Sequence, residues 1–153
     1  KKKKMSMKTA NYLALKSTEI FARMLKEIDE DIQLIKNIKS LKKKGNLKVW
    51  LPSKLLKEES SFLKNWDSTS DSVAAWLYEK LNAKGLLFIK SLKLTRKRYN
   101  LKYLQDQKII DQNVGKYILK KKDIRIVGPE IIGLLKKPCP WKEMLLQMKE
   151  IEF

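Results

Sequence analysis

The spacing of apolar residues predicts a long helix at the start of the chain. One set recurs at alternating intervals of four and three residues, which places its members on one face of a helix. This set is Phe21, Leu25, Ile28, Ile32 and Ile35. We expect the helix to span about residues 9–44, after a basic flexible tail over residues 1–8. Its apolar face covers too few heptads for a coiled coil, so we favour packing on the protein's own core over pairing with a partner helix.

The middle of the chain carries the signals for two further helices. Pro52 is placed to open the first, because its missing N–H would be unpaired in a first helical turn anyway. A turn rich in capping residues, Asp67–Asp71, precedes the second, which we expect over Ser72–Leu81. Gly85 then suits the left-handed conformation that ends many helices.

Short strands are expected in the second half of the chain. Leu86–Ile89 is a continuous apolar run typical of a buried strand, whereas Lys93–Leu104 fits either a strand or a helix. Gly115–Gly128 has the pattern of a hairpin, with Lys120–Lys122 in its turn. A last amphipathic helix is expected over Trp141–Ile151.

Together these elements predict an α+β fold, predominantly helical with one or two small β-hairpins, in a single compact domain over residues 9–153. The order of capped helix, glycine and strand over Asp71–Lys93 resembles a winged helix–turn–helix. This resemblance implies that the helix Ser72–Leu81 lies in the major groove of DNA. The alternative is a helix that only packs beneath the strand, which its low positive charge favours.

The chain is strongly basic, and its charge is unevenly distributed. Its 153 residues include 35 Lys and Arg against 17 Asp and Glu, a net charge of +18 at pH 7. Residues 1–44 hold 13 basic and 5 acidic residues and residues 84–125 hold 13 and 3, so these blocks carry +8 and +10 and the rest is neutral. Two focused blocks indicate a polyanionic partner such as nucleic acid. The 31 lysines and 4 arginines favour contact with phosphates over the reading of bases.

The composition excludes several kinds of active site. Histidine is absent, so no histidine acts as a general base or metal ligand. The single Cys139 rules out an intramolecular disulfide and a cysteine-cluster zinc site, and we interpret it as a small apolar residue. The five glycines form no phosphate-cradling motif, and Asp67 and Asp71 are placed as helix caps. We therefore expect a protein that is not an enzyme and holds neither a cofactor nor a metal.

The second basic block supplies the candidate contact residues. Its cations can neutralise phosphates and release counterions, and exposed rings between them can stack on unpaired bases. The candidates for nucleic-acid binding are Lys93, Arg96, Lys97, Arg98, Lys102, Lys120, Lys121, Lys122 and Arg125. Tyr99 and Tyr103 lie among them. If this segment is a strand, both rings point away from the neighbouring cations and belong to the core.

The C-terminal segment is the candidate surface for docking other protein subunits. Apolar residues continue to the last position, where a terminus usually frays. The residues expected to meet partners are Trp141, Met144, Leu145, Met148 and Phe153. No apolar run is long enough to span a membrane and no secretory signal is evident, so we expect an intracellular protein without membrane contact.

These observations predict a basic, non-enzymatic protein that binds DNA or RNA as an accessory subunit of ribosomal, replication or transcription machinery. It would grip phosphates mainly through Lys and Arg of residues 84–125. The alternative is a protein-interaction subunit that docks through the N-terminal helix and the segment 141–153. Salt distinguishes the two, because charge contacts are screened and apolar burial is not.

Overall fold

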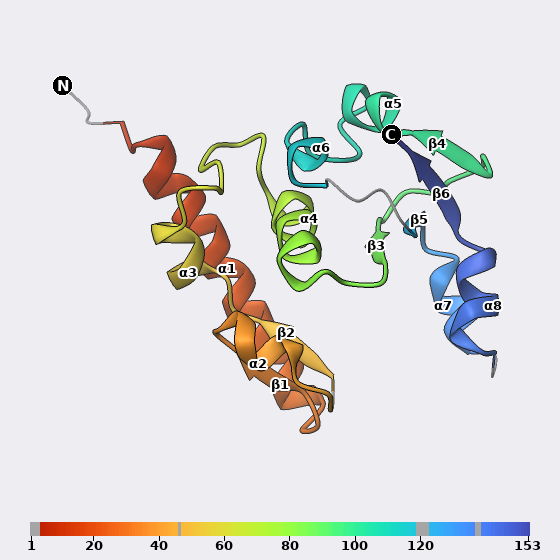
Figure 1. The fold of residues 1–153 in the computed structure, drawn as a ribbon, viewed down its shortest axis with the longest axis horizontal. Coiled ribbons are helices and arrows are strands. Elements are labelled where there is room, and N and C mark those ends of the chain that lie inside the picture. Colours follow the sequence, from red (N-terminus) through yellow and green to blue (C-terminus); the bar gives the residue numbers. More distant parts are fainter. Residues whose placement is uncertain (1–3, 46, 119–122, 137–138) are drawn as a thin grey trace.

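The expected mixture of helices and short strands is confirmed. The computed structural model describes residues 4–45, 47–118, 123–136 and 139–153. In these ranges the protein has an α+β fold in which mostly short helices surround two small sheets (Figure 1). None of the helices in these ranges is long and apolar enough to cross a membrane.

The N-terminal part combines one long helix with a small parallel sheet. Its elements are α1 (Met7–Ile28), β1 (Gln33–Ile35), α2 (Ile38–Lys42), β2 (Lys48–Trp50) and α3 (Ser53–Glu58). β1 and β2 pair in parallel, and α2 connects them. α3 begins directly after Pro52, as expected, and packs beside α1.

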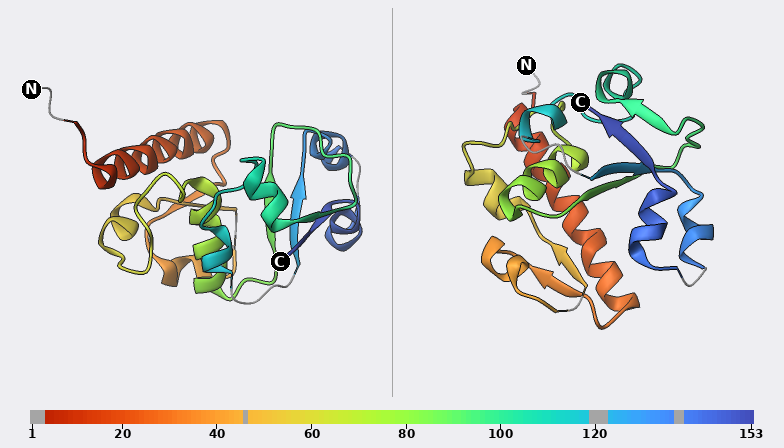
Figure 2. Two further views of the ribbon diagram at one scale, coloured as in Figure 1. Left: turned by 90° about the horizontal axis from the view of Figure 1, so that it is seen from above. Right: turned by 45° about the vertical axis from the view of Figure 1, so that its right-hand side comes forward.

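The C-terminal part is built on a mixed four-stranded sheet. Its elements are α4 (Ser70–Leu81), β3 (Leu86–Ile89), β4 (Arg98–Asn100), α5 (Leu101–Asp106), α6 (Val114–Tyr117), β5 (Ile124–Val127), α7 (Ile131–Leu135), α8 (Trp141–Leu146) and β6 (Lys149–Glu152). The strand order is β3-β5-β6-β4, with β5 and β6 antiparallel and the outer pairs parallel. α7 and α8 lie on the side of this sheet that faces away from α4 (Figure 2).

α4 lies between α1 and the four-stranded sheet (Figures 1 and 2). Its buried apolar side chains belong to the main hydrophobic core. Its Trp76 is buried and stacks on Trp50 of β2, with 5.8 Å between the ring centroids. The predicted helix over Ser72–Leu81 is therefore confirmed, and it begins two residues earlier. Asn82, and not the expected Gly85, takes the left-handed conformation at its end, with φ of 51°.

The long N-terminal helix expected over about residues 9–44 is wrong in its second half, because α1 ends at Ile28. Three consecutive acidic residues, Asp29 to Asp31, follow, and negative charge is unfavourable at the negative end of a helix dipole. The Asp29 carboxylate also accepts a hydrogen bond from the backbone N–H of Asp31 at 2.9 Å, which favours a turn. The predicted apolar stripe is thus divided between α1, β1 and the connection between them.

The expected hairpin over Gly115–Gly128 is wrong in its first strand. Tyr117 ends the short helix α6, and its hydroxyl accepts a hydrogen bond from the backbone N–H of Leu63 at 2.9 Å. β5 finds its partners far away in the sequence, in β3 and β6. The winged-helix resemblance is not confirmed, because β3 pairs in parallel with β5, whereas a wing is an antiparallel hairpin. The predicted turn Lys120–Lys122 lies outside the described residues.

The last helix is also shorter than expected, since α8 ends at Leu146 and β6 follows. The residues proposed to dock partners instead fill the protein's own interior. Met144 and Met148 are 6% and 3% exposed in a small core with Val127 and Ile131, and Leu145 packs against it. Phe153 packs against the main core, and the side chain of Trp141 lies outside the described ones. The structure gives no support to a docking surface here.

A basic groove as candidate nucleic-acid interface

A polar groove of about 500 Å³ opens between the segment that leads into β4 and the segment that joins α8 to β6. The charged residues that line it are Arg96, Lys97, Arg98, Arg125, Lys149 and Glu150. Cations therefore outnumber carboxylates in its wall by 5 to 1. A concave site with this imbalance attracts anions more strongly than a flat surface, because its low-dielectric walls focus the field.

Strand pairing places three of the charged residues in a row across the sheet. Glu150 on β6 is in register with Arg125 on β5 and with Arg98 on β4, so the three side chains share one face. Its Oε2 lies 3.5 Å from Arg98 Nε and 3.9 Å from Arg125 Nη1. Glu152 also contacts Arg98, with 3.3 Å between Oε1 and Nη1. Glu150 is thus shared by two guanidinium groups, and its contact with Arg125 is the longer of the two.

The side chain of Arg125 is largely buried, at 16% exposed. That of Lys149 is similar at 18%, whereas that of Arg98 is 67% exposed. The Nε of Arg125 is buried and has no hydrogen-bond acceptor among the described residues. Leaving a buried donor unsatisfied costs about 1–3 kcal/mol. Arg125 lines the groove, and the planar guanidinium group of arginine matches phosphate geometry, so a phosphate in the groove would meet a cation that the protein itself pairs poorly.

Tyr99 holds the basic segment in front of β4 in place. This residue lies on β4 and is 5% exposed. Its hydroxyl accepts hydrogen bonds from the backbone N–H groups of Thr95 and Arg96, at 2.9 and 3.0 Å. Tyr99 is therefore a core residue that positions the wall of the groove, and it does not present its ring to a base.

Tyr103 has a different environment, because the chain changes from strand to helix at Leu101. Tyr103 is 37% exposed, and its ring stacks on that of Tyr99, with 6.1 Å between centroids. The guanidinium carbon of Arg96 lies 4.6 Å from the Tyr103 centroid. A cation held over a ring in this way keeps its in-plane N–H donors available to an anion.

The groove brings together four of the nine predicted contact residues: Arg96, Lys97, Arg98 and Arg125. Lys97 is exposed, and no ion pair with it occurs in the part of the chain that the structure describes. Lys93 and Lys102 lie outside the groove, and Lys102 pairs with Asp106 along α5 at 2.7 Å. Lys120, Lys121 and Lys122 are outside the described residues.

Sequence reasoning missed the contribution of β6 to this groove. Lys149 donates a hydrogen bond to Glu130 at 2.8 Å, and this bond lowers the pKa of the Glu130 carboxyl. The alternation of polar and apolar residues over 150–153 is a strand signal that could have indicated β6. It was obscured because Met144, Met148 and Ile151 also fit one face of a helix.

A second group of charged residues lies at the start of α4 and has a structural role. The Asp111 carboxylate accepts hydrogen bonds from Thr69 N–H at 2.6 Å and from Ser72 N–H at 3.0 Å, so it caps the helix from a distant segment. Asp71, expected to be a cap, pairs with Lys90 at 2.6 Å. Burial raises the pKa of Asp71 more than Lys90 lowers it. Within the described ranges, no three metal-ligating side chains are grouped to hold an ion.

Comparisons of the chain with protein-family models, with curated proteins and with solved structures found no match.

Proposed function

We propose that the protein binds nucleic acid through its phosphate backbone, with the basic groove as the principal contact, and acts without catalysis in a nucleoprotein complex. The observation that carries this proposal is a groove lined by five cations and one carboxylate, in which the described ion pair of Arg125 is long at 3.9 Å. A phosphate in the groove would neutralise these charges. The net charge of +18 favours a polyanion over a small anion, because it extends well beyond one groove.

The side chains of the groove favour contact with the backbone over the reading of sequence. Arg98, one of the three arginines that line the groove, is already engaged by two carboxylates, so its fork is not free. Bidentate recognition of guanine needs an arginine whose fork is unobstructed. We therefore expect affinity that depends strongly on salt and weakly on sequence.

Equilibrium binding to labelled duplex DNA, single-stranded DNA and RNA across a salt series tests the proposal. The slope of log affinity against log salt is about −0.9 per phosphate contact for duplex and about −0.7 for single strands. Lys97→Gln removes an exposed groove cation, so we expect weaker binding and a slope that is shallower by about one contact. Lys102→Gln is the control, because it removes an exposed cation that lies outside the groove.

Two results would contradict the proposal. The first is a slope near zero for all three ligands, which would leave the charge without a polyanionic partner. The second is an equal loss of binding in Lys97→Gln and Lys102→Gln, which would indicate a diffuse contact with the whole basic surface and no special role for the groove.

A further inference from the structure

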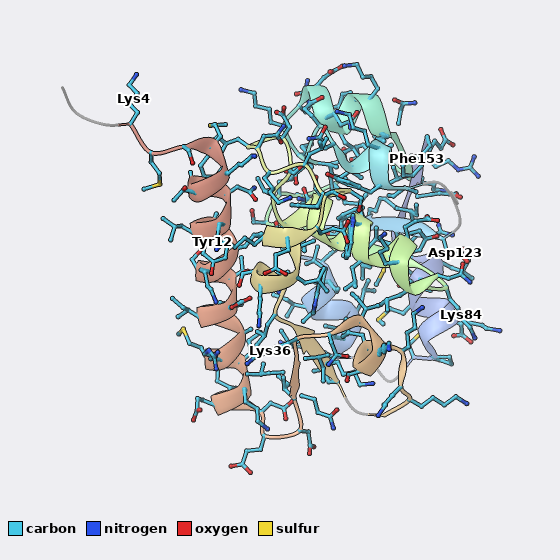
Figure 3. All side chains as sticks on the ribbon, turned by 60° about the vertical axis from the view of Figure 1, so that its left-hand side comes forward. Lys4, Tyr12, Lys36, Lys84, Asp123 and Phe153 are labelled. Carbon is cyan, nitrogen blue, oxygen red and sulfur yellow. The ribbon has the colours of Figure 1, made fainter. Side chains whose placement is uncertain are left out.

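The outer face of α1 is apolar and exposed over its whole length. Successive residues of a helix are about 100° apart around its axis. On α1, one arc that is itself about 100° wide contains no charged residue. The large side chains in this arc are Leu13, Ile20, Phe21, Met24 and Ile28, which are 47%, 63%, 60%, 56% and 81% exposed. Figure 3 shows α1 at the edge of the molecule, with side chains along its outer side that point away from the rest of the protein.

The protein's own fold does not use this face. The buried residues of α1 are Asn11, Leu15, Glu19 and Ala22, which lie on the opposite side of the helix. Contiguous exposed apolar surface on a protein usually marks an interaction site. The stripe differs from the one expected from the sequence, because it shares only Phe21 and Ile28 with it and otherwise consists of Leu13, Ile20 and Met24.

We propose that this face pairs with the same face of a second copy of the chain, with the two α1 helices antiparallel. Side-chain size is complementary in this arrangement. When Leu13 faces Ile28 of the partner subunit, the small Ser17 faces the large Met24, and Ile20 faces Phe21 at the two-fold axis. The Ser17 hydroxyl already donates to the carbonyl of Ala14 at 2.7 Å, so its burial leaves no donor unsatisfied.

The charges along α1 also favour the antiparallel arrangement. Residues 7–17 carry two lysines and no acidic residue, a net +2, whereas residues 18–31 carry Arg23 and Lys26 against five acidic residues, a net −3. An antiparallel pair places each basic half beside an acidic end, and a parallel pair places like charges together. The net charge of +18 on each copy opposes association, but its repulsion is screened beyond about 8 Å at physiological ionic strength.

Mass measurement by light scattering or sedimentation equilibrium tests the pairing. We expect the wild-type chain to approach twice its 18.0 kDa as its concentration rises, and Ile20→Asp to remain a monomer. Ile132→Asp is the matched control, because Ile132 on α7 is 61% exposed, close to the 63% of Ile20, and lies away from α1. A wild-type chain that stays monomeric, or equal dissociation by both variants, would overturn the proposal.

Cross-linking determines the direction of the helices. In a Cys139→Ser background, a short bismaleimide should link Ile20→Cys to its own copy, because these positions lie within about 2 Å along the axis of an antiparallel pair. Leu13→Cys should not be linked, because its copies would be separated by about 22 Å along that axis. Efficient linkage at position 13 would indicate parallel helices and contradict the arrangement proposed here.

Discussion

Arg125 combines incomplete polar contacts in the folded protein with a proposed role in binding. Its Nε lacks an acceptor, and its one described ion pair, with Glu150, is long at 3.9 Å. Replacing a whole buried ion pair by apolar residues is often neutral or stabilising, and removing one partner is costly mainly where the other charge is left buried and unpaired. Glu150 is 44% exposed and also contacts Arg98 at 3.5 Å, so the loss of Arg125 would leave no unpaired buried charge.

We predict that Arg125→Met separates these two effects. Its free energy of unfolding, measured with urea, should be unchanged or higher by about 1 kcal/mol. Its affinity for nucleic acid should fall about tenfold, the equivalent of one charge-assisted hydrogen bond. Arg98→Met is the control, since Arg98 is 67% exposed and engaged by two carboxylates, and should show no gain in stability. A large loss of stability in Arg125→Met would show that Glu150 pairs with Arg125 more strongly than the distance indicates.

At the scale of elements, Glu19 joins two helices through a hydrogen bond that depends on its charge. It lies on the buried face of α1 and accepts from the backbone N–H of Ser53, the first residue of α3, at 2.8 Å. Burial raises the pKa of Glu19, but hydrogen bonds from Ser53 and Lys16 together lower it by more, so the net shift is downward. The carboxylate form therefore stabilises the fold.

We predict that Glu19→Gln lowers the free energy of unfolding by about 1.5–3 kcal/mol at pH 7, the range for a hydrogen bond to a charged group. Because the folded pKa lies below the ordinary value of 4.5, the stabilisation is present above pH 4.5 and disappears as pH falls through the folded pKa. Urea unfolding at several pH values should show the two proteins converging in acid. Glu27→Gln on the exposed side of α1 serves as control and should leave stability nearly unchanged.

Elements with complete local signals were predictable from the sequence, and elements that depend on distant partners were not. α4 has capping residues before it and an apolar face within it, and β3 is a short apolar run that ends in a turn. β6 was assigned to a helix, because only its pairing with β4 and β5 selects a strand. The end of α1 could have been predicted from the sequence, because three acidic residues at a helix C-terminus interact unfavourably with the helix dipole.

The candidate site was predictable only in part, for a related reason. Charge density along the chain identified the basic segment that includes Arg96, Lys97 and Arg98. The position of Arg125 beside them follows from the strand order β5-β6-β4, which no local pattern encodes. Glu150, which moderates the charge of the groove, could not be assigned to it without that order.

At the scale of the whole molecule, the groove and α1 lie on opposite sides of the protein (Figure 1). The α1 face can therefore pair with a second copy without covering the groove. Such a dimer would present a groove at each end, and two linked sites bind a polymer more tightly than one when both can engage it. The dimer and the groove would then reinforce each other, although each is testable alone.

The charge of the whole chain also predicts how binding responds to pH. Histidine is the side chain that ordinarily changes charge between about pH 5 and 8, and it is absent from the chain. The formal charge of the protein should therefore change little between about pH 6 and 7. We expect the affinity for oligonucleotides without terminal phosphates to stay constant over this range at fixed ionic strength, as measured by fluorescence anisotropy. A marked change in affinity would show that a carboxyl near the groove has its pKa raised into this range, and would weaken the view that lysine and arginine alone set the binding.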